Sequence, residues 1–190
     1  MKRSLIIGLI LVLTGPPAIL LGSHKPDLSL LFEDFGRGDY AVEGHFHIQG
    51  RRPIVWQVLT DYDHMTQFIS SMRRCTVQQR EDGRLLLKQE AYGRLWIFSR
   101  KIEVLLSVLE TPMTQITFED IANKDFYSYQ GSWEIREKSK GRLEVIYRLN
   151  AKRKFLAPGP FAKAAFEKSA ESLLNEVRSE IVRRQGGNSV

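Results

Sequence analysis

The feature that most constrains the fold is a change in the spacing of apolar residues late in the chain. Across residues 40–149, short segments alternate apolar and polar side chains, which is typical of half-buried β-strands. After Pro158-Gly159-Pro160 the spacing becomes three and four residues, with no Gly or Pro until Gly186. The apolar positions of that last segment include Phe166, Ala170, Leu173, Val177 and Ile181. This spacing predicts an amphipathic helix of about seven turns.

The segments before this helix predict a strand, two short helices and a meander. Residues 40–49 form the first predicted strand, and the helices are expected over 53–61 and 64–68. The later strands are expected over residues 74–80, 84–92, 96–109, 115–120, 125–137 and 143–149. Asp82-Gly83 and Gly93 are expected in turns. Because the connections are too short for parallel crossovers, we expect an antiparallel sheet of about seven strands.

The N-terminal segment, residues 1–23, has the outline of an export signal. Lys2 and Arg3 precede an apolar run, but Leu20 and Leu21 stand where a cleavage site needs small residues. Both a cleaved signal peptide and an uncleaved anchor therefore fit, and both place the remaining chain outside the cytoplasm, in the cell envelope. We expect a linker over 24–38, one domain over 39–185 and a flexible tail over 186–190.

The charge balance and the cysteine count narrow the range of possible partners and exclude an intrachain disulfide. The 190 residues carry 28 Lys plus Arg against 22 Asp plus Glu, a net charge of +6. Residues 1–23 contain two basic and no acidic side chains, so the remainder has a net charge of +4. This mild, interspersed surplus argues against a nucleic-acid partner. Cys75 is the only cysteine, so no disulfide can form within the chain.

Three local motifs carry a resemblance to a known family. They are Val55-Trp56-Gln57-Val58-Leu59-Thr60-Asp61-Tyr62, Gly131-Ser132-Trp133-Glu134-Ile135, and Pro158-Gly159-Pro160-Phe161. Their order resembles the START-like helix-grip superfamily, in the branch of polyketide cyclases and coenzyme Q-binding proteins. The resemblance implies an α+β fold in which a curved antiparallel sheet wraps around the long C-terminal helix. It also implies a cavity for an apolar ligand between sheet and helix.

Aromatic side chains mark the expected ligand site. Tyr127, Tyr129 and Trp133 share one face of a predicted strand, and Phe98 and Tyr147 extend this wall on other strands. Arg100 shares the face of Phe98, so if it points inward it must be paired or meet an anionic or carbonyl head group. The helical side chains assigned to the same site are Trp56, Phe68, Phe161 and Phe166.

A basic and apolar segment precedes the last helix. Lys152-Arg153-Lys154 would attract anionic lipid head groups, and Phe155 and Leu156 would enter the membrane interface. We therefore expect a membrane surface as a second partner beside the apolar ligand. A solvated turn is the alternative. The sequence leaves the oligomeric state open.

Other chemistry has little support in the sequence. His45 and His47 share a strand face, but no third metal ligand follows in a recognisable pattern, so we predict no metal site. Phosphate-loop, dinucleotide and nucleophile-elbow motifs do not occur, and no cofactor is expected.

Binding of a lipid, quinone or polyketide-like compound, serving transport or sequestration, is the predicted function. The alternatives are a cyclase or aromatase in which Tyr129, Arg100 or Asp61 would polarise the substrate, and a protein-interaction module with a filled core.

Overall fold

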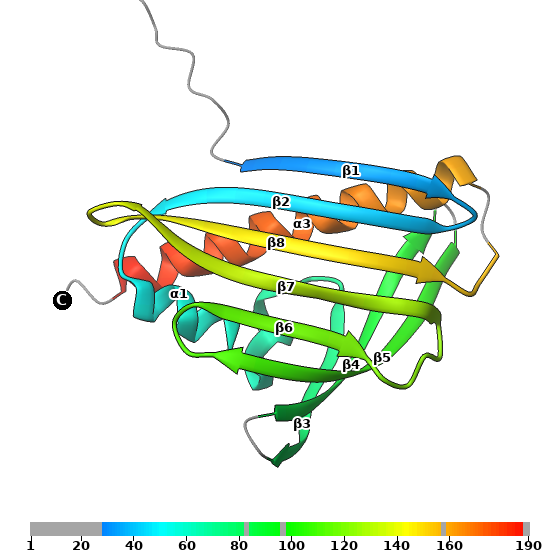
Figure 1. Cartoon of the computed structure of the whole chain (residues 1–190), viewed down its shortest axis with the longest axis horizontal. Coiled ribbons are helices and arrows are strands. Elements are labelled where there is room, and N and C mark those ends of the chain that lie inside the picture. Colours follow the sequence, from blue (N-terminus) through cyan, green and yellow to red (C-terminus); the bar gives the residue numbers. More distant parts are fainter. Residues whose placement is uncertain (1–27, 82–83, 96–97, 157–158, 188–190) are drawn as a thin grey trace, which may run out of the picture.

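A curved antiparallel sheet wraps around one long helix (Figure 1). The computed structural model describes residues 28–81, 84–95, 98–156 and 159–187. The strands are β1 (Leu28–Gly36), β2 (Asp39–Gln49), β3 (Met72–Glu81), β4 (Arg84–Leu95), β5 (Phe98–Thr111), β6 (Gln115–Asp120), β7 (Phe126–Ser139) and β8 (Arg142–Arg153). The helices are α1 (Arg52–Leu59), the 3-10 turn η1 (Tyr62–His64), α2 (Met65–Phe68) and α3 (Gly159–Gly186). This arrangement confirms the predicted START-like helix-grip fold.

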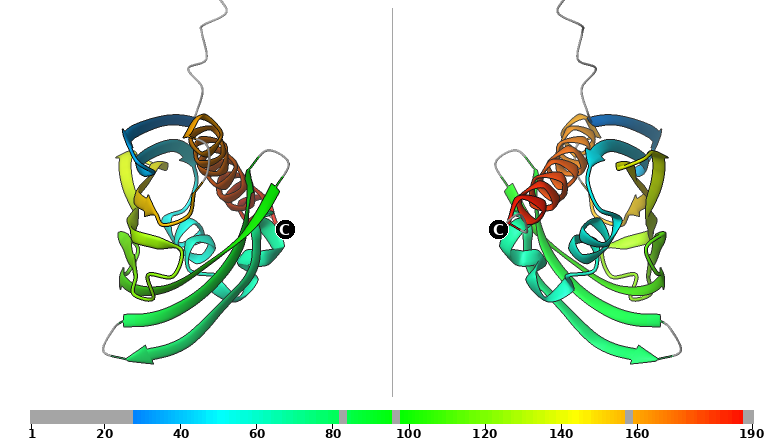
Figure 2. Two further views of the ribbon diagram at one scale, coloured as in Figure 1. Left: turned by 90° about the vertical axis from the view of Figure 1, so that its right-hand side faces the viewer. Right: turned by 90° about the vertical axis from the view of Figure 1, so that its left-hand side faces the viewer.

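The strand order places β2 between the first strand, β1, and the last strand, β8. It runs β1-β2-β8-β7-β6-β5-β4-β3, and every neighbouring pair is antiparallel. Figure 2 shows the sheet curling so that α3 crosses its open side. The concave face of the sheet, covered by α3, therefore encloses the core.

The β2 strand shows why alternation fixes one face of the sheet. Tyr40, Val42, Phe46 and Ile48 are buried, whereas the residues between them are partly exposed. Gly44 lies on the same face, and a Cβ atom there would come within 2.3 Å of a Leu174 methyl carbon. The missing side chain therefore lets α3 pack directly on β2, where burial of Leu174 contributes roughly 1.5–3 kcal/mol.

Residues 28–36 form the strand β1 in place of part of the linker expected over 24–38. This strand pairs with β2 from Leu28 opposite Phe46 to Gly36 opposite Asp39. Leu28, Leu30 and Phe32 pack against the core, so this strand has an inward apolar face of its own. The sheet therefore has eight strands, one more than the seven expected.

Gly93 differs from the turn expected there. It lies inside β4, which continues to Leu95, and Gly93 pairs with Arg100 of β5.

The predicted export segment 1–23 lies outside the described residues. Within the described ranges, no helix is both long and apolar enough to cross a bilayer.

Candidate functional site

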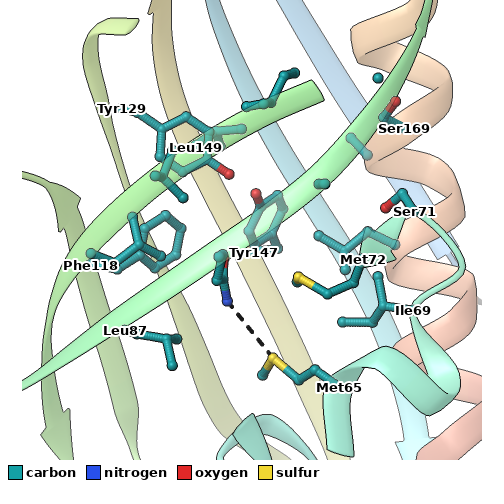
Figure 3. A pocket seen from close by; sticks show the side chains of 18 of the residues that line it. Met65, Ile69, Ser71, Met72, Leu87, Phe118, Tyr129, Tyr147, Leu149 and Ser169 are labelled. Atoms are coloured by element: carbon teal, nitrogen blue, oxygen red, sulfur yellow. Dashed lines mark hydrogen bonds between the residues drawn. The ribbon is translucent and has the colours of Figure 1, made fainter. Parts of the chain in front are cut away.

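A cavity of about 240 Å³ lies between the concave face of the sheet and α3 (Figure 3). Strands β3 to β8 form its walls, α1, η1 and α2 form its floor, and α3 covers the remaining side. The lining is mainly apolar and includes Val58, Met65, Met72, Leu87, Ile102, Val104, Leu106, Ile116, Phe118, Phe126, Leu149, Phe166 and Leu173. A molecule inside it would be largely removed from water.

Aromatic rings form the wall on β6, β7 and β8. Trp133 and Tyr147 have ring centroids 4.5 Å apart, and those of Phe126 and Tyr129 are 4.8 Å apart. Phe118 lies over Gly131, where an added Cβ would come within 2.6 Å of the Phe118 ring and 2.2 Å of the Arg148 carbonyl oxygen. The glycine therefore leaves the space that the Phe118 ring occupies beside the cavity.

Two phenol groups are the polar feature in the middle of this wall. The Tyr129 and Tyr147 hydroxyls point toward one another in Figure 3. Burial raises the pKa of Tyr129, and hydrogen bonding to Tyr147 opposes that shift. Burial raises the pKa of Tyr147 still further, with the nearby Tyr129 adding to it. Both side chains are therefore neutral at physiological pH and serve as hydrogen-bonding groups rather than bases.

A second polar group, Gln89, lies on β4 toward α2. Its amide nitrogen is 3.9 Å from the sulfur of Met65, the contact that is dashed in Figure 3, and 3.5 Å from that of Cys75. Burial raises the pKa of the Cys75 thiol to about 11. Cys75 is therefore a protonated, inert thiol in the core near the cavity.

Arg100 lies at the rim of the cavity. Its Nη2 atom donates to Asp125 Oδ1 at 2.8 Å, while Asp125 Oδ2 accepts from the Glu103 backbone N–H at 2.9 Å. The guanidinium carbon is 4.7 Å from the centroid of the Phe155 ring. The Arg100 side chain remains 45% exposed, so the ion pair holds it in place and leaves donors facing outward.

Most of the residues predicted for the site line the cavity. They are Phe68, Arg100, Tyr129, Trp133, Tyr147 and Phe166. Trp56 packs against the core and Phe161 is exposed near the start of α3, and neither is among the lining residues. The side chain of Phe98 lies outside the described residues.

The prediction for Tyr127 is wrong. The register between β7 and β8 shifts between Phe126 and Ser128, so Tyr127 is the extra residue of a bulge. Phe126 consequently points inward and is 2% exposed, whereas Tyr127 points outward and is 64% exposed. Phe126 therefore lies in the aromatic wall of the cavity, at the position that the alternation of the sequence assigns to Tyr127.

Several lining residues were missed although the sequence carries a signal for them. Ile102, Val104, Leu106 and Val108 alternate along β5 in phase with Arg100, so they belong to the predicted inner face. Met65, Met72 and Gln89 gave no such signal. They reach the cavity because the sheet curls over α2. This curvature is a property of the whole fold and leaves no mark on the spacing of apolar residues.

The side chains of the basic and apolar segment 152–156, just before α3, point in different directions. Lys152 pairs with Asp39 at 3.4 Å, and Arg153 donates to the Phe155 carbonyl oxygen. Phe155 lines the cavity instead of extending outward, and Leu156 is fully exposed. Phe155 therefore does not extend outward as expected, and of the two apolar residues only Leu156 is exposed.

Two other candidate groups lie away from the cavity. Asp61 bonds to His64 and to Arg184, each at 2.6 Å, and does not line the cavity. His45 lies between Glu43 and Glu144 on the outer face of the sheet. Across the part of the chain that the structure describes, no group of three His, Cys, Asp or Glu side chains could hold a metal ion.

The fold and the apolar cavity between sheet and helix together define a START-like helix-grip domain. Residues 53–178 match the family model described as polyketide cyclase / dehydrase and lipid transport. The chain therefore belongs to that family, whose description agrees with a site for a hydrophobic ligand. A comparison with curated proteins gives no significant match.

Solved structures share this fold at low sequence identity. The ZhuI aromatase/cyclase from Streptomyces sp. R1128 is 13% identical with a TM-score of 0.65, over 80% of this chain and 99% of that one. A STAR-related lipid transfer protein from Xanthomonas axonopodis is 13% identical with a TM-score of 0.66, and the match covers 83% of this chain and 94% of that one. Human STARD10 is 10% identical with a TM-score of 0.68, and the match covers 84% of this chain and 71% of that one. These similarities show a common fold and leave the ligand unspecified.

Proposed function

We propose that this protein binds a small apolar molecule in the cavity between the sheet and α3. The observation that carries the proposal is a mainly apolar cavity of about 240 Å³ between the sheet and α3, next to a pair of phenol groups. Burial of apolar ligand surface would provide the driving force, at roughly 25 cal/mol per Å². A module with a filled core would lack such a space.

The polar groups support a ligand with an oxygen acceptor. One hydroxyl of the Tyr129 and Tyr147 pair can donate to the other, which leaves one O–H to donate to a carbonyl or ether oxygen. Arg100 adds a cation at the rim for an anionic or carbonyl head group. A lipid, a quinone and a polyketide-like compound all combine an apolar body with such an oxygen.

The position of the cavity supports transport or sequestration of the bound compound. A molecule held between the sheet and α3 would have much of its apolar surface shielded from water.

Binding is favoured over a cyclase reaction because the described lining offers no carboxylate or imidazole base, while Tyr129 and Arg100, which were considered for catalysis, do line the cavity. Among the described lining residues there is no carboxylate and no histidine, and the two central tyrosines have raised pKa values. Asp61, one of the residues considered for catalysis, lies outside the cavity. A general base poised near neutral pH is what such a reaction would require.

A matched pair of substitutions on α3 tests the site. Ala165 lines the cavity, whereas the adjacent Ala164 is exposed and does not. Ala165→Trp should fill the space and reduce uptake of 1-aminoanthracene, a small apolar fluorophore, at least tenfold. Ala164→Trp should bind it like the wild type, and equal uptake by both variants would contradict the proposed site.

We further propose that the protein works in the cell envelope, carried there by residues 1–23. The support is the basic start followed by an apolar run in that segment. Fusing a reporter enzyme that is active only after export to the C-terminus would test this. Reporter activity that is lost on deletion of residues 1–23 is expected. An inactive fusion, or activity that is unchanged by the deletion, would contradict export by this segment.

A further inference from the structure

Three exposed apolar side chains gather at one end of the molecule. They are Tyr127 at the start of β7, Leu156 after β8 and Phe161 in the first turn of α3, and we call them the end patch. Their exposed fractions are 64%, 101% and 46%. Figure 1 shows the β6–β7 connection, the end of β8 and the start of α3 at the same, right-hand end of the sheet.

Contacts of Lys154 hold the segments of the end patch together. Its ammonium nitrogen lies 5.2 Å from the centroid of the Tyr127 ring and donates to the Asn123 carbonyl oxygen. Its backbone N–H donates to the Asp125 carbonyl oxygen at 2.9 Å. These contacts join the end of β8 to the start of β7, and thereby place Leu156 and Tyr127 on neighbouring segments.

The charges around the end patch leave a positive surplus. Among the described residues, no carboxylate forms an ion pair with Lys154 or Lys163. On the side of Lys154, Asp125 is paired with Arg100, and Glu103 is paired with Lys101 and Lys124. Lys154 and Lys163 each lie over an aromatic ring, those of Tyr127 and Phe32, so their charges are not neutralised there by a carboxylate. Apolar side chains flanked by such lysines are complementary to the negative surface of an anionic bilayer.

The end patch adjoins the rim of the cavity. Phe155 stands between Lys154 and Leu156 in the chain, and its ring lines the cavity beside the Arg100 guanidinium. A surface that contacts a membrane here would bring the bilayer to the rim. An apolar ligand could then pass between bilayer and cavity with little exposure to water.

We propose that the end patch, with Lys154 and Lys163, docks the protein on an anionic lipid bilayer. Tyr127, Leu156 and Phe161 enter the interface, and the two lysines contact lipid phosphates. This surface differs from the sequence expectation, because Lys152 is paired with Asp39 and Phe155 faces the cavity. The inference builds on the proposed function in assuming that the ligand is exchanged with a membrane.

The test uses a fluorescent probe at single positions of the full chain. Leu156→Cys and Phe161→Cys would be labelled with an environment-sensitive dye, and Leu109→Cys would serve as the control. Leu109 is an exposed leucine near the end of β5, remote from the β6–β7 connection (Figure 1). The buried Cys75, with its raised pKa of about 11, should not react at neutral pH.

Vesicles of phosphatidylglycerol mixed with phosphatidylcholine should shift emission to the blue at positions 156 and 161 but not at 109. The shift should disappear with pure phosphatidylcholine and be reduced by high salt or by Lys154→Glu. Because the signal is local, attachment through the N-terminal segment alone cannot produce it.

Three outcomes would overturn the docking proposal. One is no shift at positions 156 and 161, another is an equal shift at 109, and the third is a concentration-dependent shift without vesicles, which would indicate a second copy on the patch. Ligand uptake is measured without vesicles, so failure of docking and failure of ligand binding are distinguishable.

Discussion

Trp133 and Tyr147 face each other directly across β7 and β8, and their ring centroids are 4.5 Å apart. This pair lies in the middle of the aromatic wall, and both rings line the cavity. The strand pairing therefore determines the wall, because the two residues are register partners. A shift of one residue in either strand would turn one ring outward.

The first prediction concerns the bulge in β7. Phe126→Ala should destabilise the protein by about 3–5 kcal/mol, because it removes a buried ring from the core. Tyr127→Ala should cost at most about 1 kcal/mol, since it removes an exposed ring that contacts the Lys154 ammonium group. Urea unfolding of both variants measures the difference. Equal losses, or a larger loss for Tyr127→Ala, would contradict the inward position of Phe126.

The second prediction concerns the phenol pair. Tyr129→Phe and Tyr147→Phe should each weaken binding of an apolar probe that carries a carbonyl group by about 5- to 100-fold, corresponding to roughly 1–3 kcal/mol for a lost polar partner. Binding of a hydrocarbon probe of the same size should be nearly unchanged. Fluorescence titration with the two probes compares them, and equal weakening of both would show that the hydroxyls do not select the ligand.

The third prediction concerns acid stability. Arg183 and then Arg184 bond to Glu180 and lower its pKa from 4.5 to about 2. A carboxyl group with a lowered folded-state pKa contributes stability above its unfolded pKa and loses it as the pH falls. Glu180→Gln should therefore be less stable than the wild type at pH 7, with the gap closing between about pH 4.5 and 2.

Thermal unfolding across that pH range measures this gap. As a control, Glu171→Gln removes an exposed carboxylate on the same helix and should leave the pH profile of the wild type unchanged. A gap between Glu180→Gln and the wild type that stays constant down to pH 2 would contradict the role of the two arginines.

The fourth prediction concerns the ion pair at the rim. Asp125→Asn should lower the free energy of unfolding by about 1–3 kcal/mol. The buried carboxylate accepts hydrogen bonds from Arg100 and from the Glu103 backbone N–H, and a neutral amide weakens both. It should also release the Arg100 side chain from the rim. Hydrogen exchange of the Glu103 amide would report the change, and an unchanged exchange rate would show that the bond to Asp125 does not order this strand.

Alternation explains which parts of the fold the sequence predicts well. The inner faces of β2 and β8 follow directly from period two, so alternation alone places Phe46 and Tyr147 on the core side of the sheet. The long helix follows from its own spacing and from the Pro-Gly-Pro segment that precedes it. Both signals are local to a single element.

The sequence was less informative where the outcome depends on pairing between distant elements. The bulge at Tyr127 arises from the register between β7 and β8, which a single strand does not encode. The β1 strand was missed because acidic residues and glycines follow its short apolar alternation. Met65 and Gln89 reach the cavity through the curl of the sheet, and periodicity carries no information on that curvature.

The most direct test of the central claim is native mass spectrometry of the full chain isolated from its own host. An apolar compound bound one to one, lost from Ala165→Trp and retained by Ala164→Trp, is the predicted result. Extraction with organic solvent would then identify its class. A protein that carries no such compound and takes up no apolar probe would contradict ligand binding in the cavity.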